Sequence, residues 1–306
     1  MPDWDAVIIG GGPAGLTAGL YLCRGSWRTL LIEKETVGGY IMNTEFIENY
    51  PGFPDGVVGS QLGMDMKNQA QKYGLKTERN EVVMLQSSPE NKTVSCADGT
   101  TYTASSVIIA GGSVPKKLGV PGEAKLRGSG VISCAFCDGS QFNDQTVAVC
   151  GGGDSGLSGA LYLAKIAARV IIIEAMPALT ATAILRDRVK DNPRIEVRLG
   201  VKVTAILGES KVEGIEFVDN SGAKGTLKAD GVLVHVGLDP NTDYLEGVVP
   251  LDKQRQVIVN EWMESEIPGI FAAGDIRSKS PGQVATAVGD GASAGMSAQK
   301  YLQKLK

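Results

Sequence analysis

Two cysteines, Cys134 and Cys137, are separated by two residues and followed directly by an acidic residue, Asp138. Reduction of a protein disulfide requires a thiolate that attacks, a second thiol that resolves the mixed disulfide and an acid that protonates the leaving thiolate. All three residue types lie within this short segment, which therefore predicts a redox-active dithiol. Two buried structural cysteines are the alternative, and the adjacent acid and glycine favour the redox interpretation.

The other cysteines and the single histidine argue against a metal site. A zinc site would need a second pair of ligands, and the chain has no second CxxC pair and one histidine, His235. Cys23 and Cys150 lie in helix and strand patterns and are expected to be buried, while Cys96 lies in a turn-rich region, and none of them is assigned a function. His235 lies between two valines in a strand pattern, so we expect it to be packed rather than catalytic.

The elements around the cysteine pair occur as two copies of one pattern. In each copy an apolar strand runs into a G-x-G-x-x-G segment, an Ala- and Leu-rich helix follows, and a second strand ends at a glutamate. The glycines allow a tight turn, close approach of a pyrophosphate and close helix packing, and the acid can accept from a ribose hydroxyl. Two copies in register predict two Rossmann-type dinucleotide units, although glycine-rich turns without a ligand are the alternative, more so for the second copy. The matching residues are Gly10, Gly12, Gly15 and Glu33 in the first copy and Gly151, Gly153, Gly156 and Glu174 in the second.

Apolar runs and turn residues predict further elements in both halves. A long Ala- and Gly-rich helix is expected near the end of the chain, at Gln283–Gln303, and a linker at Pro115–Pro121. The predicted strands are Asp5–Ile9, Thr29–Ile32, Thr100–Thr103, Val107–Ala110, Thr146–Cys150, Arg169–Ile173, Gly231–Val236 and Ile270–Ala273, with a hairpin of Val212–Val218 and Gly225–Lys228.

Length, composition and charge restrict the classes of function. The 306 residues suit two domains, and 43% hydrophobic and 21% charged residues are typical of a globular protein. A net charge of −4 without a stripe of basic residues argues against nucleic acid as a partner. No run of eighteen apolar residues and no signal peptide is apparent, so we expect a soluble, cytoplasmic protein with no membrane contact.

Taken together, these motifs resemble the low-molecular-weight thioredoxin reductases, which are flavoprotein disulfide reductases with two dinucleotide-binding domains. The resemblance covers nearly the whole chain, and the CxxC lies in the second domain, as it does in that family. It rests on Gly10–Gly15 with Glu33, Gly38-Gly39, Asn49–Gly52, Cys134–Gly139, Ala272–Asp275 and Gln283–Ala287.

The resemblance implies an α/β fold of two Rossmann-like three-layer ββα domains, with the second inserted in the first. The FAD-binding domain would be discontinuous and comprise residues 1–115 and 248–306, and residues 116–247 would form an NAD(P)-type domain that carries the CxxC. Members of the family are homodimers whose domains rotate against each other and show the dithiol alternately to the flavin and to thioredoxin.

The resemblance also assigns roles to individual residues. Cys137 would face the flavin and accept electrons, Cys134 would attack the disulfide of thioredoxin, and Asp138 would be the general acid and base. The candidate FAD-binding residues are Gly10, Gly12, Pro13, Ala14, Gly15, Glu33, Lys34, Gly39, Tyr40, Ile41, Asn49, Val83, Ala110, Gly111, Gly274, Asp275, Gln283, Val284 and Ala285.

The chain departs from this family at the second fingerprint. Members that use NADPH follow the second strand with a basic cluster, His-Arg-Arg and a further Arg, which holds the 2′-phosphate. Here Glu174 stands at this place, and the next positive charge is Arg186. A carboxylate repels a 2′-phosphate, so the sequence disfavours NADPH. Acidic residues of relatives in the following helix are replaced by Leu157-Ser158-Gly159.

The electron donor is therefore open at this stage. Glu174 alone would suit the ribose of NADH, but few polar groups follow it, and a second site without any nucleotide is favoured at least equally. We expect a non-nicotinamide donor such as ferredoxin first, NADH second and NADPH third. A small-molecule dithiol oxidase that uses oxygen is the alternative enzyme, and a flavin-bound redox sensor without turnover is the alternative outside catalysis.

Overall fold

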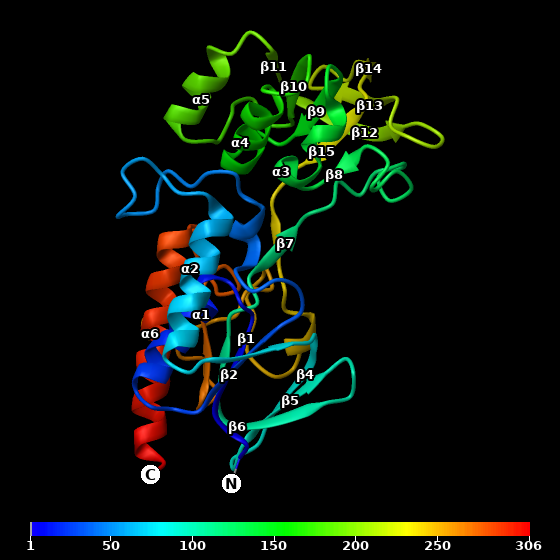
Figure 1. Cartoon of the computed structure of the whole chain (residues 1–306). Coiled ribbons are helices and arrows are strands. Elements are labelled where there is room, and N and C mark those ends of the chain that lie inside the picture. The colour runs from blue at the N-terminus through cyan, green and yellow to red at the C-terminus, as the bar shows by residue number, and fades with distance from the viewer. Residues whose placement is uncertain (1) are drawn as a thin grey trace. The chain divides into compact units, whose positions relative to one another are not determined.

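The computed structural model describes residues 2–306, which divide into two compact units (Figure 1). The first unit consists of the described residues up to Val114 together with Pro240–Lys306, and the second is Pro115–Asp239. The predicted position of the second border was 247/248 instead. Residues 240–247 pack with the first unit because Leu245 is fully buried in its core, a long-range contact that no local pattern indicates.

Seven strands form the sheet of the first unit. Their order is β3-β2-β1-β6-β5-β4, with β17 paired to β6. The strands β1, β2, β3, β6 and β17 run parallel. At one edge, β5 pairs antiparallel with β6, and β4 pairs antiparallel with β5. The bounds are β1 Trp4–Ile9, β2 Thr29–Glu33, β3 Lys76–Arg79, β4 Val82–Ser87, β5 Lys92–Cys96, β6 Thr101–Ile109 and β17 Ile270–Ala272.

Helices cover one face of this sheet, as Figure 1 shows. They are α1 (Pro13–Arg24), α2 (Gly59–Lys72) and α6 (Val284–Lys304), and the short helices η1 (Gly39–Asn43) and η3 (Asp243–Leu245) complete the unit. Helix α6 approaches α1 closely at Gly291. A Cβ on this residue would be only 2.2 Å from the Ala14 carbonyl oxygen. The small residues of this helix therefore let the two helices share one face.

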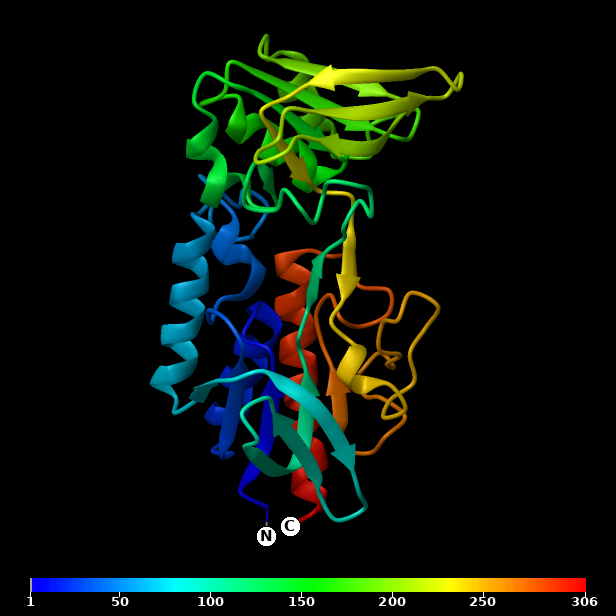
Figure 2. The same ribbon diagram turned by 90° about the vertical axis from the view of Figure 1, so that its right-hand side faces the viewer.

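The second unit repeats this plan with a separate core. Its parallel sheet has the order β11-β10-β9-β15-β8, and a three-stranded antiparallel sheet, β12-β13-β14, packs on one face (Figure 2). Helices lie on the other face. The bounds are β8 Val131–Ile132, α3 Ala135–Asp138, η2 Gly139–Phe142, β9 Thr146–Cys150, α4 Asp154–Leu163, β10 Arg169–Glu174, α5 Ala183–Lys190, β11 Ile195–Leu199, β12 Val201–Leu207, β13 Gly214–Asp219, β14 Lys224–Lys228 and β15 Gly231–Val234.

The three layers arise from alternating burial along single strands. In β9, Val147 and Val149 lie in the core beneath the helices, whereas Ala148 and Cys150 lie in the core beneath the antiparallel sheet. A strand that is buried on both faces reads as a continuous apolar run, which is why these strands were visible in the sequence. The predicted fold class, two Rossmann-like α/β units with three layers, is confirmed.

Two short strands connect the units. They are β7 (Ser113–Pro115) and β16 (Leu238–Pro240), and they pair with each other. The predicted linker therefore begins as a strand, and the predicted strand Gly231–Val236 ends earlier, at Val234. Within residues 2–306, no helix is long and apolar enough to cross a membrane.

Candidate redox and dinucleotide sites

The two cysteines of the CxxC segment form a disulfide in the second unit. Cys134 and Cys137 are joined, with their Cα atoms 5.4 Å apart. Cys134 caps the short helix α3, and the backbone N–H of Cys137 donates to the Cys134 sulfur at 3.0 Å. The backbone N–H of Asp138 donates to the Cys134 carbonyl at 3.2 Å. The structure thus brings the three predicted catalytic residues together on one helical turn.

The surroundings of the disulfide combine a buried anchor with exposed groups. Ala135 is buried in the core, whereas Phe136 is 40% exposed and lies edge-on to the Tyr162 ring at 5.6 Å. Cys137 is exposed and Cys134 is half-buried. One cysteine is thus more accessible to a reacting partner than the other.

A hollow of about 230 Å³ opens beside the disulfide helix. Asp138 lines it together with Glu123, Arg127 and Lys116. Glu123 is only 5% exposed, and its carboxylate accepts from the backbone N–H of Gly119 at 2.8 Å. Charged groups of both signs therefore lie on the Asp138 side of the disulfide.

The first glycine fingerprint joins β1 to α1 in the first unit. Gly10 has a φ of +108°, and a Cβ on it would lie 2.3 Å from the Ala110 carbonyl oxygen. A Cβ on Gly15 would lie 2.0 Å from the Gly10 carbonyl oxygen. Neither position can hold a side chain. Helix α1 therefore begins directly after the strand, with its first turn at residues 12–14, and the backbone N–H groups at this helix start can bind an anion.

The glutamate at the end of β2 organises this loop. One carboxylate oxygen of Glu33 accepts from the N–H of Gly11 at 2.7 Å, and the other accepts from the N–H of Glu35 at 2.9 Å. A carboxylate has about four acceptor positions, so two remain for the hydroxyl groups of a ribose. A Cβ on Gly39 would lie 2.6 Å from the Cα of Gly12, so the next loop also approaches the fingerprint closely.

Most of the candidate FAD residues gather at the carboxyl ends of the parallel strands, where α/β sheets bind ligands. The end of β6 lies beside the end of β17, because the two strands pair in parallel. A Cβ on Gly274 would lie 3.0 Å from the Ala14 side chain and 3.7 Å from that of Ala287 in α6. The residues gathered in this way are Gly10, Gly12, Pro13, Ala14, Gly15, Glu33, Ala110, Gly111, Gly274, Asp275, Gln283, Val284 and Ala285.

The other candidates lie on neighbouring segments. Ile41 is buried in η1, next to the exposed Tyr40, and Lys34 is exposed directly after β2. Asn49 donates from its amide to Gln283 Oε1 at 2.9 Å, which ties the loop before α2 to the start of α6. Val83 is 48% exposed at a bulge in the edge strand β4, and its role stays a prediction.

A buried ion pair braces the loop after β17. The Arg277 guanidinium donates to both carboxylate oxygens of Asp290, at 2.7 and 2.8 Å, and Asp290 also accepts from the Gly274 N–H at 3.2 Å. Burial raises the pKa of the neighbouring Asp275 carboxyl, and the charge of Asp290 raises it further. The loop thus holds an acid that is costly to ionise unless a ligand compensates for the lost water.

Two side chains next to Gly111, at the end of β6, were not predicted from the sequence. The Asn241 amide donates to the Gly111 carbonyl at 3.0 Å, and the Tyr244 hydroxyl lies 3.6 Å from where a Cβ on Gly111 would be. Both were assigned to the other domain because the border was placed too late in the chain. With the border at Pro240 they would have been assigned to the first unit, since they directly follow the strand that returns to it.

These features fit a bound FAD. Among the residues that the structure describes, the Tyr244 hydroxyl is the buried side-chain polar group without a hydrogen-bond partner. Burial raises the pKa of Tyr244 far above its ordinary value, so this hydroxyl keeps its proton and is available as a donor. An orphaned buried donor is costly, and a ligand with acceptor atoms would satisfy it. The glycines of the first fingerprint would accept the pyrophosphate of the same ligand.

The second fingerprint repeats the backbone geometry of the first. Gly151 has a φ of +121°, a Cβ on it would lie 2.0 Å from the His235 carbonyl oxygen, and a Cβ on Gly156 would lie 2.1 Å from the Gly151 carbonyl oxygen. Glu174 accepts from the N–H of Gly152 at 2.6 Å, as Glu33 does in the first copy. The predicted repeat is therefore present in three dimensions.

The loop after β10 covers the second fingerprint differently. The N–H of Thr180 donates to the Gly152 carbonyl at 3.0 Å, and the N–H of Thr182 donates to an Asp154 carboxylate oxygen at 2.7 Å. The Leu179 side chain lies 2.8 Å from where a Cβ on Gly152 would be. An apolar side chain and a carboxylate thus occupy the region where the first copy presents glycines and a proline.

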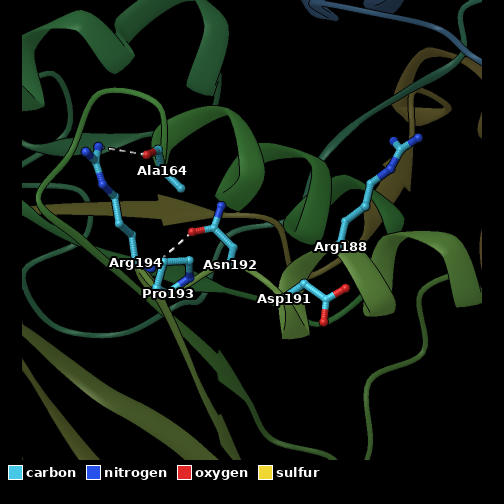
Figure 3. Close-up of a pocket in the computed structure, with 6 residues that line it drawn as sticks. All are labelled: Ala164, Arg188, Asp191, Asn192, Pro193 and Arg194. Atoms are coloured by element: carbon cyan, nitrogen blue, oxygen red, sulfur yellow. Dashed lines mark hydrogen bonds between the residues drawn. The ribbon is translucent and has the colours of Figure 1, made fainter.

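A larger hollow of about 470 Å³ lies elsewhere in the second unit (Figure 3). It is formed at the end of α5 and the loop before β11, at the amino ends of the parallel strands, whereas the fingerprint lies at their carboxyl ends. Arg194 donates to the Ala164 carbonyl at 3.1 Å and so is committed to the backbone, while the Arg188 side chain extends away from it. This hollow is separate from the disulfide and has no part in the chemistry described above.

The remaining cysteines are buried, as expected for Cys23 and Cys150 and also observed for Cys96. Burial raises the pKa of all three thiols, and it raises the pKa of Cys150 to about 12. Such thiols are poor nucleophiles at neutral pH. Across residues 2–306, no cluster of three or more His, Cys, Asp or Glu side chains could hold a metal ion.

Comparison with known proteins gives a consistent result. The family model of the pyridine nucleotide-disulphide oxidoreductases matches residues 4–291. The thioredoxin reductase of Listeria monocytogenes is 40% identical over 305 residues, covering 99% of this chain and 95% of that protein, and the one of Bacillus subtilis is 39% identical. The crystal structure of Lactococcus lactis thioredoxin reductase superposes with a TM-score of 0.96 at 34% identity, over 99% of this chain and all of that one.

The fold and the disulfide site define a flavoprotein-type disulfide oxidoreductase with two dinucleotide-binding units. The chain belongs to the pyridine nucleotide-disulphide oxidoreductase family and, within it, to the thioredoxin reductases. The predicted enzyme class, an FAD-dependent thioredoxin-disulfide reductase, is confirmed at the level of this family.

Proposed function

We propose that this chain binds FAD in its first unit, passes electrons to the Cys134–Cys137 disulfide and reduces thioredoxin with the resulting dithiol, as a homodimer. The observation that carries the proposal is the disulfide on α3, which is preceded and followed by the elements of a dinucleotide unit. Bound FAD would supply a two-electron carrier. The candidate residues at the strand ends of the first unit would hold it.

The exchange with thioredoxin follows from the residues of α3. The Cys134 thiolate forms a bond to one sulfur of the thioredoxin disulfide, and the other sulfur leaves as a thiolate that takes a proton from Asp138. Cys137 then loses its proton and attacks the Cys134 sulfur, which re-forms the disulfide of this chain, and the thioredoxin sulfur that was bound to Cys134 leaves as the second thiol. The N–H of Cys137 lies 3.0 Å from the Cys134 sulfur, and a donor at this position would stabilise a thiolate there.

We further propose that the electron donor is not NADPH. Glu174 and Asp154 supply two carboxylates at the second fingerprint, and the next cation after Glu174 is Arg186. Like charges about 4 Å apart in a partly screened site oppose each other by roughly 4 kcal/mol, which disfavours a 2′-phosphate. A non-nicotinamide donor such as ferredoxin is favoured first and NADH second.

Anaerobic mixing of the FAD-loaded protein with each donor tests both the proposed electron path and the proposed order of donors. Reduced ferredoxin or NADH is expected to bleach the flavin and to support reduction of thioredoxin, and the Cys137→Ser variant should bleach without reducing thioredoxin. Rapid stoichiometric bleaching by NADPH would contradict the order of donors. Oxygen consumption with a small dithiol, without turnover of thioredoxin, would favour a dithiol oxidase instead. The covering of the second fingerprint by Leu179 is the observation that supports this second candidate.

A further inference from the structure

The single histidine bridges two loops of the second unit. His235 directly follows β15, and its Nε2 lies 3.0 Å from the carbonyl oxygen of Ser133, the residue before Cys134. Its Nδ1 lies 2.9 Å from the carbonyl oxygen of Ser155, in the first turn of α4. One ring therefore spans the peptide that enters the disulfide helix and the helix that follows the second fingerprint.

The number of protons on this ring determines how many of its two partners it can bind. Both are carbonyl oxygens, which can only accept hydrogen bonds, whereas a neutral imidazole has one N–H and a protonated one has two. The neutral ring of His235 can therefore hold one of the two loops at a time, and the protonated ring can hold both.

A glycine in α4 lies next to the ring. A Cβ on Gly159 would lie 3.6 Å from His235 Cε1, 3.6 Å from the Ala135 side chain and only 2.6 Å from the Leu233 side chain. The ring thus packs against the same point of α4 as the first residue of the disulfide helix. A glycine is unfavourable inside a helix, and the close approach of the Leu233 side chain gives a reason for its presence.

The backbone of His235 belongs to the same junction. Its N–H donates to the Cys150 carbonyl at 2.9 Å, and its own carbonyl oxygen packs against Gly151, the first glycine of the second fingerprint. The acidic residues on the two helices packed against the ring are Asp154 on α4 and Asp138 on α3. Main chain and side chain of one residue therefore contact both ends of the strand-to-helix turn.

We propose that His235 is a positioning residue of the redox centre, which ties the peptide before Cys134 to the first turn of α4 and holds it more firmly when the ring carries two protons. The proposal rests on the redox role of the Cys134–Cys137 disulfide within the proposed function. It does not depend on the electron donor. His235 touches neither sulfur in this role and acts through the main chain of Ser133.

Hydrogen exchange of the oxidised, FAD-loaded protein tests the tie directly. The His235→Phe variant keeps a ring in the slot but has no donor, and the Val236→Ala variant changes an exposed neighbour as the matched control. We expect amides in peptides covering 133–138 and 154–159 to exchange about five- to tenfold faster in His235→Phe at pH 6, and no change in Val236→Ala. Exchange within twofold of the parent protein at both loops would overturn the proposal.

A rate measured against pH separates positioning from simple packing. Dithiothreitol gives two electrons and two protons to the disulfide, so that Cys134 and Cys137 become thiols and the reagent becomes a cyclic disulfide. We expect the ratio of this rate in the parent protein and in His235→Phe to change three- to tenfold between pH 5.5 and 8. A constant ratio would show that the ring only fills space.

Two features keep these outcomes separate from those of the proposed function. The rate with dithiothreitol needs neither a nicotinamide nor thioredoxin, so a wrong donor or partner leaves it unaffected. If His235→Phe fails to fold, His235→Gln keeps one nitrogen that can donate, and its charge does not change with pH, so it is expected to hold one loop at every pH. Its exchange should then lie between those of the parent protein and an untied loop. A ratio of the dithiothreitol rates of the parent protein and this variant that stays constant between pH 5.5 and 8 would contradict the proposal.

Discussion

The two glycine fingerprints share a backbone and differ in what covers it. In the first, the N–H of Gly38 donates to the Gly11 carbonyl at 2.8 Å, and in the second, the N–H of Thr180 donates to the Gly152 carbonyl at 3.0 Å. The first cover is a pair of glycines that leaves the loop open to a ligand, while the second brings the Leu179 side chain onto Gly152. The turn geometry therefore shows that a unit can fold as a Rossmann unit, and the covering loop decides what it can bind.

The two fingerprints also differ in the first residue of the helix that follows each of them. Helix α1 begins with Pro13, which has no side-chain acceptor, whereas α4 begins with Asp154, whose carboxylate already receives the N–H of Thr182. An anionic ligand at the start of α4 would meet this carboxylate, which opposes its charge. The second loop thus satisfies its own donors, as the first one does not.

The largest effect is expected from closing the first site. In the Gly39→Leu variant, a side chain would enter at a φ of +70° with its Cβ 2.6 Å from the Gly12 backbone. We expect at least a 100-fold weaker Kd for FAD, about 3 kcal/mol, measured by flavin fluorescence. The matched change on the second cover, Thr180→Gly, should leave FAD binding unchanged. If purified Gly39→Leu contained one FAD per chain, the loop that covers the first fingerprint would not control FAD binding.

A smaller effect is expected from adding positive charge to the second site. Replacing Ala175 and Met176 with arginine places two cations directly after Glu174, where a 2′-phosphate would need them. We expect NADPH to bind about tenfold more tightly in this double variant, as measured by calorimetry. The control is Glu216→Arg, which changes the charge at an exposed position of β13. An equal gain in the control would show that net charge alone is responsible.

The acid in the first site should influence stability in a pH-dependent way. Burial raises the pKa of Asp275, so the folded apoprotein keeps this proton to a higher pH than the unfolded chain does. The free energy of unfolding therefore decreases as the pH rises from about 4, the ordinary aspartate value, through the raised one. We expect apo Asp275→Asn to melt a few degrees higher at pH 7 and equally at pH 4. A lower Tm at pH 7 would contradict the direction of this shift.

The smallest effect is expected at the orphaned hydroxyl. Tyr244→Phe removes a buried donor without changing the shape of the ring, so the apoprotein should be as stable as the parent or slightly more so. If FAD accepts from this hydroxyl, its Kd should increase about three- to tenfold, roughly 1 kcal/mol. Parallel melting and fluorescence titrations measure both quantities, and an unchanged Kd would leave the hydroxyl without its proposed acceptor.

The features that the sequence predicted are those that depend on local constraints. The turns at Gly10 and Gly151 admit no side chain, so glycine is required there whatever the rest of the fold does. The alternation of burial in β9 is also encoded within a few residues. These constraints predicted both units and placed Cys134 and Cys137 in the second one.

The features that were missed depend on contacts between distant segments. Strand β12 carries alternating exposed residues and gains its place only by pairing with β13, and Tyr244 reaches Gly111 only because the chain returns to the first unit at Pro240. His235 was expected to be a packed residue. Its two carbonyl partners, Ser133 and Ser155, lie far from it in the chain, so only the structure reveals the bridge.

The paired strands β7 and β16 have a consequence for how such a chain could arise. The N–H of Lys116 donates to the Gly237 carbonyl at 2.9 Å, and the Lys116 ammonium lies 3.4 Å from an Asp239 carboxylate oxygen. The two ends of the second unit therefore emerge side by side, like the ends of a loop. A gene segment encoding such a unit can enter or leave a host sequence at one point, and its neighbours need only a short turn to close the gap.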